Sequence, residues 1–323
     1  MDYVFVLVGL TMLLAGGEGI LRGSLSIATR FRLSGFFVGV VIIGFGTSLP
    51  ELLVSVAAAL KGAPELALGN VVGSNIANIL LILGLTVLVA PVPCREKGVR
   101  RDALAVVVVS LLLVGFTFGE AAGLLTGLVM LTVLAGYMTY SYLEERQRGE
   151  MPDLVGEAAL EHPASGDMRV ALLYCVAGLF LLVTGADFLV DGATALAEGW
   201  GVPQAIIGLT LVAVGTSLPE LAASLVAAFR RQGGIVIGNI LGSNLFNILG
   251  VLGVTVLITP LPFVGRIAET DVWIMLLVAV ALWLTIWVRQ KIGRLVGLVF
   301  LVSYIFYVMV LYTSDAGRAV VHL

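Results

Sequence analysis

A seven-residue motif, Gly-Thr-Ser-Leu-Pro-Glu-Leu, occurs twice in this chain, at 46–52 and at 215–221. Each copy is followed after the same gap by a second pattern, Gly-Asn-x-x-Gly-Ser-Asn-x-x-Asn, at 69–78 and at 238–247. Both patterns keep the same offset of 169 positions. A repeat this regular predicts that the two halves of the chain fold as two versions of one structural unit.

Composition determines the class of protein. The chain is 59% hydrophobic and 12% charged, with a mean hydropathy of +1.09, which is typical of a polytopic membrane protein and too apolar for a soluble domain. Ten apolar stretches are long enough to cross or nearly cross a bilayer. They cover 3–20, 35–60, 66–89, 104–118, 122–142, 170–190, 203–229, 235–258, 273–288 and 295–312. We therefore expect an all-α polytopic membrane protein with ten transmembrane helices.

The distribution of basic residues predicts the orientation. With the N-terminus placed outside, only Lys61, Arg266 and Arg318 of the 18 basic residues fall in external segments. All the others fall in cytosolic connections: Arg22, Arg30, Arg32, Arg95, Lys97, Arg100, Arg101, Arg146, Arg148, Arg169, Arg230, Arg231, Arg289, Lys291 and Arg294. The positive-inside rule then predicts a multi-pass protein of the cell (inner) membrane with both termini extracytoplasmic.

Five spans in each repeat, an odd number, require the second half to enter the membrane with the opposite polarity. We expect a first inverted repeat at 1–143 with its motifs at 44–84, and a second at 169–323 with its motifs at 213–253. The polar, acidic segment 144–168 is interpreted as a cytosolic linker. Inverted repeats around a polar site are the architecture of alternating-access transporters.

The N-terminal stretch and the two cysteines add further predictions. The N-terminal apolar stretch lacks a basic segment before it and a cleavage site after it, which predicts a retained span and not a signal peptide. Cys94 and Cys175 lie in different halves without metal-ligand spacing. We expect both to be free thiols.

The repeated motifs place polar side chains near the middle of the membrane, where such groups are costly and usually functional. Helical spacing puts the members of each motif on one helix face. In the first half these residues are Thr47, Ser48 and Glu51, then Asn70, Ser74 and Asn78; in the second half they are Thr216, Ser217 and Glu220, then Asn239, Ser243 and Asn247.

Prolines add backbone ligands. Pro50 and Pro219 remove a helical N–H and are expected to free carbonyl groups near Gly44 and Ala213. Carboxylates, hydroxyls, amides and carbonyls together form an all-oxygen site, which suits hard cations and Ca²⁺ especially. At an effective dielectric constant of 20, two carboxylates about 5 Å apart repel by roughly 3 kcal/mol, whereas Ca²⁺ at about 2.4 Å attracts each by roughly 14 kcal/mol before desolvation.

Two other functional classes are compatible with some of these residues. An intramembrane hydrolase using Ser48 or Ser217 lacks a base, because the two histidines, His162 and His322, lie in the linker and the tail. A passive cation channel remains an alternative, although channels usually place the pore on an oligomer axis. Gly69, Gly73, Gly238 and Gly242 are expected to be packing residues, and Glu18 and Asp187 to be structural. We expect no enzyme activity, no nucleic acid and no obligate protein partner.

The doubled GTSLPE and GNxxGSNxxN motifs resemble the α-repeats of the cation/calcium antiporter superfamily, and particularly its prokaryotic Na⁺/Ca²⁺ exchanger branch. The resemblance covers essentially the whole chain. It implies that Ca²⁺ or several Na⁺ bind at overlapping sites between the repeats, and that the first and sixth spans slide over the other eight. The transported ions and the lipid bilayer are the only partners it implies, and no cofactor is expected.

The resemblance also implies roles for individual residues. Glu51 and Glu220 are expected to bridge the Ca²⁺ and Na⁺ sites, and Thr47 and Thr216 to contribute carbonyl oxygens. Asn78 and Asn247 are expected to line the middle of the site. The flanking Na⁺ ligands are expected to be Ser48, Ser74, Ser217 and Ser243 with the carbonyls of Gly44 and Ala213. Some relatives carry Asp in place of Asn247, and the Asn in both copies speaks against K⁺ dependence.

The sequence therefore predicts a secondary active antiporter that exports Ca²⁺ against entering Na⁺ by alternating access, in an electrogenic cycle. Proton-coupled relatives usually carry a GNxxE-type motif in place of GTSxPE, which favours Na⁺ as the driving ion. Exchange of Ca²⁺ for H⁺, or of another divalent cation, remains the alternative within transport.

Overall fold

The computed structural model describes residues 2–95, 97–119, 121–148, 167–200, 215–263 and 266–321. Within these ranges the fold is almost entirely helical, and eight helical segments are long and apolar enough to cross a membrane. A shorter apolar helix, Leu218–Phe229, and the 20-residue helix Lys97–Phe116 accompany them. The all-α polytopic class is confirmed. The count of ten spans stays a prediction, because part of the expected seventh stretch lies outside the described residues.

The helices of the first half are α1 (Asp2–Phe31), α2 (Gly35–Val38), η1 (Gly39–Ile43), α3 (Gly44–Thr47), α4 (Leu49–Leu60), α5 (Pro64–Ala77), η2 (Asn78–Leu83), α6 (Gly84–Val89), α7 (Lys97–Phe116) and α8 (Leu124–Arg148). Those of the second half are α10 (Met168–Gly199), α13 (Leu218–Phe229), α14 (Gly233–Leu245), η4 (Phe246–Val251), α15 (Leu252–Ile258), η5 (Ile267–Asp271), α16 (Val272–Val288) and α17 (Arg294–Val321). The η elements are π-helical turns within longer spans.

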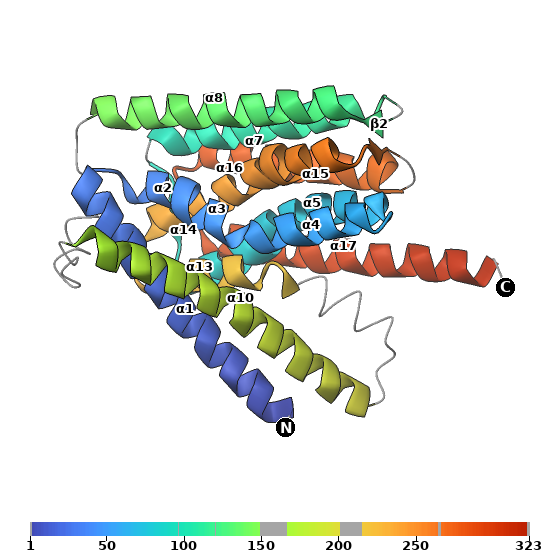
Figure 1. The fold of residues 1–323 in the computed structure, drawn as a ribbon, viewed down its shortest axis with the longest axis horizontal. Helices are drawn as coiled ribbons and strands as arrows, with labels where there is room; N and C mark the ends of the chain where they lie inside the picture. Colours follow the sequence, from blue (N-terminus) through green and yellow to red (C-terminus); the bar gives the residue numbers. More distant parts are fainter. Residues whose placement is uncertain are drawn as a thin grey trace.

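Two pairs of short strands define the two ends of the helical body. β1 (Val92–Pro93) pairs antiparallel with β4 (Lys291–Ile292), and β2 (Ala121–Ala122) pairs antiparallel with β3 (Leu261–Pro262). Each pair joins one strand from each half of the chain. In Figure 1 the β2 strand marks the end of the body opposite the start of α10.

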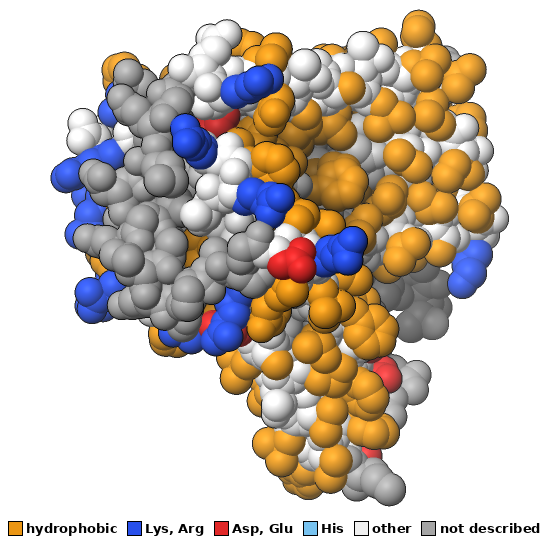
Figure 2. Space-filling model, turned by 60° about the vertical axis from the view of Figure 1, so that its left-hand side comes forward, with side chains coloured by type: hydrophobic (Ala, Val, Ile, Leu, Met, Phe, Trp, Pro, Cys, Tyr) orange, Lys and Arg blue, Asp and Glu red, His pale blue; other side chains and the backbone are white. Residues whose placement is uncertain are grey.

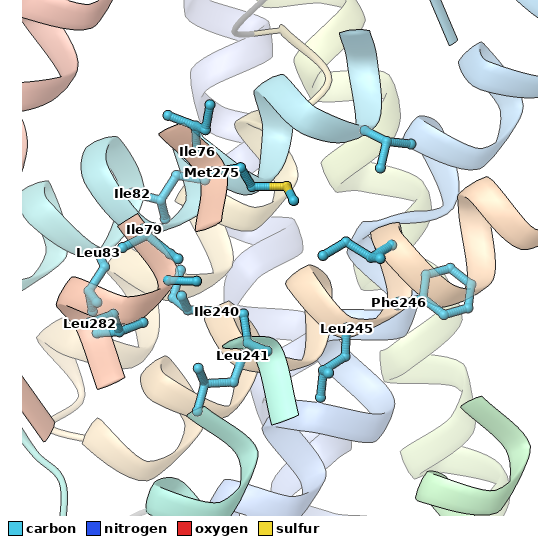
Figure 3. Packing of buried hydrophobic residues seen from close by; sticks show 14 of the residues in the cluster. Ile76, Ile79, Ile82, Leu83, Ile240, Leu241, Leu245, Phe246, Met275 and Leu282 are labelled. Carbon is cyan, nitrogen blue, oxygen red and sulfur yellow. The ribbon is translucent and has the colours of Figure 1, made fainter. Parts of the chain in front are cut away.

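The most buried helices form the centre of the body. In the span that contains α14 and η4, 89% of the most apolar 18-residue stretch is buried inside the protein. In α17 the corresponding share is 11%. Figure 3 shows Ile76, Ile79 and Ile82 of the first half packed with residues of the second half, including Ile240 and Leu241. Every side chain of α14 is buried, so α14 is surrounded by protein and not by lipid.

Helices α1 and α10 form a slanted antiparallel pair beside this body (Figure 1). Glycines let their backbones touch, because a Cβ on Gly9 would lie 2.8 Å from the carbonyl oxygen of Gly185, and one on Gly16 would lie 2.8 Å from that of Gly178. Small residues at such crossings are the usual means of close helix packing in membranes. The two helices therefore form one packing unit.

Other differences from the expected boundaries are small. α8 continues to Arg148, into the range predicted as linker, and residues 149–166 of that linker lie outside the described residues. Cys94 and Cys175 are free thiols, as predicted. Glu18, expected to be structural, forms ion pairs with Arg22 and Arg230.

We predict that Gly178→Ala destabilises the protein by about 1–3 kcal/mol, because overpacking forces the backbones apart. The added Cβ would lie 2.5 Å from the backbone nitrogen of Ile20. Gly136→Ala on α8 is the matched control, since a Cβ there meets nothing within 4 Å. Thermal unfolding in detergent measures both variants, and equal melting temperatures would contradict the close approach of α1 and α10.

Candidate functional site

The two Gly-Thr-Ser-Leu-Pro-Glu motifs form helix breaks. Ser48 has φ −84° and ψ 6° between α3 and α4, and Ser217 has φ −90° and ψ 4° before α13. In both copies the proline follows in the first turn of the new helix, where its missing N–H costs nothing. Ser48 thus interrupts the helix between Thr47 and Glu51, and all three side chains are fully buried. That they share one face stays a prediction.

The break places a carboxylate in the first turn of α4 and another in the first turn of α13. Glu51 is 0% exposed and Glu220 is 1% exposed. The carboxylates are linked across the halves, because the Ser48 hydroxyl donates to Glu220 Oε1 at 3.3 Å and the Ser217 hydroxyl donates to Glu51 Oε1 at 3.5 Å.

The second oxygen of each carboxylate, Oε2, has no hydrogen-bond partner among the described residues. Neither carboxylate forms an ion pair with a lysine or arginine of the described chain. A buried carboxylate without a compensating charge is strongly unfavourable in a membrane protein. Each carboxylate therefore has one unpartnered oxygen in the buried interior of the body.

Two asparagines hold the carboxylate helices in place. Asn70 Nδ2 donates to the backbone oxygen of Glu51 at 3.1 Å and to the Ser55 hydroxyl at 2.9 Å. Asn239 Nδ2 makes the same contacts in the second half, to the backbone oxygen of Glu220 at 3.3 Å and to Ser224 at 2.9 Å.

Asn70 and Asn239 lie on predicted polar faces, whereas Ser55 and Ser224 are not among the predicted site residues. Ser55 and Ser224 keep the 169-residue offset of the motifs, and this signal could have identified them. Both serines are buried, at 0% and 1% exposure, so each Asn–Ser pair is an internal link between neighbouring helices.

Further contacts connect the two halves. Ser243 donates to the carbonyl oxygen of Gly44 at 3.3 Å, and Asn247 Nδ2 donates to the Ser74 hydroxyl at 3.0 Å. The Gly44 carbonyl, expected to be free, also accepts from the Ser48 N–H at 3.3 Å. It is thus already engaged by two donors.

Asn78 and Asn247 lie in the π-helical turns η2 and η4. Asn78 is 1% exposed, and neither atom of its amide has a hydrogen-bond partner among the described residues; the same holds for Asn247 Oδ1. Such π-helical turns frequently occur at functional sites. The turns present these amides to the interior, where they remain available to a ligand.

The threonines differ from each other. Thr47 is fully buried, and its hydroxyl donates to the carbonyl oxygen of Ile43 at 3.0 Å and lies 3.4 Å from Asn239 Oδ1. Thr216 is half-buried and lines a cavity of about 310 Å³. Ala213, the remaining predicted site residue, lies outside the described residues.

This cavity lies beside the motifs. Its lining includes Pro50 and Leu53 from the first half, Pro219 from the second, and Asp187 and Asp191 of α10. A second cavity, of about 240 Å³, lies near β1 and is lined by none of the predicted site residues. The larger cavity is therefore the one that reaches the repeated motifs.

The glycines of the two Gly-Asn-x-x-Gly-Ser-Asn motifs differ in how closely other atoms pack against them. A Cβ on Gly238 would collide with the backbone oxygen of Phe36, and one on Gly242 with that of Val40, so their predicted role in packing is confirmed. A Cβ on Gly69 would meet only the side chain of Ile267, at 3.2 Å, and one on Gly73 would meet nothing within 4 Å among the described residues.

The site is rich in oxygen atoms and has two carboxylate groups, each of which carries a negative charge when ionised. The described residues contain no cluster of three or more His, Cys, Asp or Glu side chains. Hydroxyl and amide oxygens supply the remaining polar groups. Oxygen ligands of this kind bind hard cations such as Ca²⁺. Softer transition metals prefer thiolate and imidazole ligands instead.

We predict that Asn239→Ala destabilises the protein by about 1–3 kcal/mol, because the backbone oxygen of Glu220 and the Ser224 hydroxyl lose their donor while buried. Thermal unfolding of Asn239→Ala, Ser224→Ala and the double variant measures the coupling. Additive losses in the double variant would rule out the proposed link, whereas a double variant close to Asn239→Ala alone supports it.

Comparison with known proteins agrees with this chemistry. The family model described as "Sodium/calcium exchanger protein" matches residues 1–143 and 170–313. The chain is 36% identical to "Putative antiporter CaxA" of Alkalimonas amylolytica, covering 96% of this chain and 98% of that protein. It is 30% identical to "Sodium/calcium exchanger MaX1" of Methanosarcina acetivorans, covering 96% of this chain and 98% of that protein.

Among solved structures, the chain is similar to the sodium-calcium exchanger NCX_Mj in crystals soaked with Na⁺ and Sr²⁺. The TM-score is 0.81 at 31% sequence identity, over 95% of this chain and 97% of that one. The match covers both halves and therefore both copies of the motifs. The chain belongs to the sodium/calcium exchanger family.

Proposed function

We propose that this protein is a secondary active antiporter that exchanges Ca²⁺ for Na⁺ by alternating access. The observation that carries the proposal is the pair of buried carboxylates, Glu51 and Glu220, each with one unpartnered oxygen and each hydrogen-bonded to a serine of the opposite half. A single Ca²⁺ neutralises both charges. The exchange function named for the relatives MaX1 and NCX_Mj supports the same assignment.

The proposed ligand set is built around the two carboxylates. Glu51 and Glu220 hold Ca²⁺ in the middle, with the carbonyl oxygens of Thr47 and Thr216. Asn78 and Asn247 line the site, and the amide oxygens of both have no hydrogen-bond partner among the described residues. The flanking Na⁺ positions use Ser48, Ser74, Ser217 and Ser243 with the carbonyls of Gly44 and Ala213. Na⁺ and Ca²⁺ are substrates, and no other cofactor takes part.

The architecture of the proposal is two inverted repeats, 1–143 and 169–323, with ten spans. Several contacts support it. The counterparts α1 and α10 pack antiparallel, and the same glycine-mediated contact occurs twice, between α6 and α17 at Gly84 and Gly297 and between α15 and α8 at Gly253 and Gly127. The strand pairs also exchange between halves. Such an arrangement is what a pseudo-twofold axis in the membrane plane generates.

Charge supports the orientation with both termini extracytoplasmic. Figure 2 shows basic side chains gathered around one end of the molecule and an apolar surface extending away from it. The exposed arginines at the ends of α1, α13 and α16 include Arg32, Arg230 and Arg289. The positive-inside rule assigns this end to the cytosol, in the cell (inner) membrane.

We expect Ca²⁺ uptake into proteoliposomes loaded with Na⁺, and little uptake into vesicles loaded with K⁺ or choline at the same pH. Glu51→Gln and Glu220→Gln should each abolish this uptake, because the amide keeps the shape of the side chain but removes a charge that Ca²⁺ requires. Glu65→Gln, an exposed glutamate in the first turn of α5, is the matched control and should retain exchange.

The same vesicles distinguish the alternatives. Uptake that follows an imposed pH gradient with no Na⁺ present would replace Na⁺ by H⁺ as the driving ion. Near wild-type exchange by Glu51→Gln or Glu220→Gln would remove the carboxylate pair from the transport site. Folding of each variant is checked by its thermal unfolding.

Exchange should also respond to membrane potential. The two carboxylates give the empty site a charge of −2, so the Ca²⁺ form is neutral, whereas a form with three Na⁺ carries +1. Moving one charge through the whole field is worth about 2.3 kcal/mol per 100 mV. Ca²⁺ uptake measured at potentials set by valinomycin and K⁺ should therefore change with potential, and identical rates at all potentials would indicate an electroneutral cycle.

A further inference from the structure

An arginine at the end of α13 is tied to helix α1. Arg230 Nη2 lies 3.0 Å from Glu18 Oε1, and Arg230 Nε lies 3.2 Å from Glu18 Oε2, so the guanidinium binds the carboxylate with two hydrogen bonds. Arg22, one turn further along α1, binds the same carboxylate at 2.8 Å. Glu18 thus connects the α1 and α10 unit to the helical body on one side of the site.

The helices are closely packed beside this ion pair. A Cβ added to Gly17 would lie 2.9 Å from Val226 Cγ2 and 3.2 Å from the carbonyl oxygen of Ala222. Ala222 and Val226 are each 8% exposed. The contact between α1 and α13 therefore closes this side of the site.

The equivalent positions of the other half are open. At the 169-residue offset, Gly17 corresponds to Ala186, Glu18 to Asp187 and Arg22 to Asp191. These three residues of α10 line the cavity of about 310 Å³ that reaches Thr216. Leu53, the counterpart of Ala222, also lines the cavity and is 69% exposed. The helix contact that closes one side is replaced by a cavity on the other.

The counterpart of Arg230 is Lys61, and the two residues occupy the same backbone position. Lys61 ends α4 with φ −83° and ψ 4°, and Arg230 ends α13 with φ −84° and ψ 8°. The next residue in each half is left-handed, at φ 74° for Gly62 and φ 57° for Arg231. Lys61 is exposed at the end of α4, which is one of the helices that line the cavity.

We propose that Lys61 and Asp187 form the ion pair that closes the opposite side of the site in the other transport state, and that the Glu18–Arg230 pair breaks when it forms. The inference rests on the proposed alternating-access cycle. In this cycle α1 and α10 move as one unit relative to the helical body, so that α1 loses its contact with α13 and α10 packs against α4. Asp187 then reaches Lys61 as Glu18 now reaches Arg230.

The charges around the cavity are consistent with this exchange. Asp187 and Asp191 lie one helical turn apart on α10, so their like charges repel, whereas the equivalent pair on α1 is the attractive Glu18 and Arg22. Closure on Lys61 offsets one of these two negative charges. Partly exposed ion pairs of this kind are weak, so each shifts the equilibrium between the two states by only about twofold to fivefold. Such pairs bias the cycle without stopping it.

The test is a cross-link between Asp187→Cys and Lys61→Cys, in a background in which Cys94 and Cys175 are replaced by Ala. We expect a bifunctional maleimide whose length matches a lysine–aspartate ion pair to join the two cysteines, because the cysteine side chains are too short to span that separation by a disulfide. Adding Glu18→Gln or Arg230→Gln should accelerate it about twofold to fivefold, because loss of the pair on the closed side favours the other state. Arg231→Gln removes the neighbouring positive charge and is the matched control, with an unchanged rate expected.

No cross-link, or the same rate with Glu18→Gln as with Arg231→Gln, would overturn the proposal. The assay needs no ion gradient, so its result is independent of the exchange assay. A chain that cross-links as expected but does not exchange Ca²⁺ for Na⁺ refutes the proposed function alone. A chain that exchanges but shows no link between the two ion pairs refutes only the gating inference.

Discussion

Two negative charges must be kept inside a body that is otherwise apolar, and the rest of the structure serves this requirement. Glu51 and Glu220 are almost completely buried, and each accepts a hydrogen bond from a serine hydroxyl of the opposite half. One serine hydroxyl does not compensate a buried charge. In the proposed transport site, bound cations or protons supply the remaining compensation, so the empty charged site is less favourable than the loaded one. An antiporter needs a site that is unfavourable when empty, because one ion then leaves only when another cation replaces it.

Precise placement of the carboxylates depends on backbone contacts that only small residues allow. Gly238 and Gly242 bring α14 against the backbone of α2 and η1, and from there Asn239 reaches the carbonyl oxygen of Glu220. The helix interruptions at Ser48 and Ser217 place each glutamate in the first turn of a helix. The helix dipole favours a negative charge at that position. The dipole reduces the cost of keeping these charges buried before an ion arrives.

The sequence predicted the polytopic class and the residues that meet at the centre, because the repeated motif and its constant offset mark them directly. Pro50 and Pro219 predicted a disturbed helix in each half, but the position of the interruption at Ser48 and Ser217 follows only from the backbone angles. The π-helical turns at Asn78 and Asn247 were also missed, because one extra residue in a turn leaves no pattern in an apolar segment. Ser55 and Ser224 were overlooked because their polar role appears only when an asparagine of the next helix is seen to contact them.

Repetition in sequence does not make the two halves identical in structure. Glu18 and Arg230 are joined on one side, while Asp187, at the position equivalent to Glu18, lines a cavity on the other. A symmetric arrangement of the halves would make the two sides of the site equally open or equally closed, whereas the described halves differ. In the proposed cycle, one sequence unit used twice adopts two conformations of nearly equal energy, and exchanging them between the halves turns the site to the other face. The similarity of the two halves would then make both transport states accessible, and the difference between the halves would provide the path for the ion.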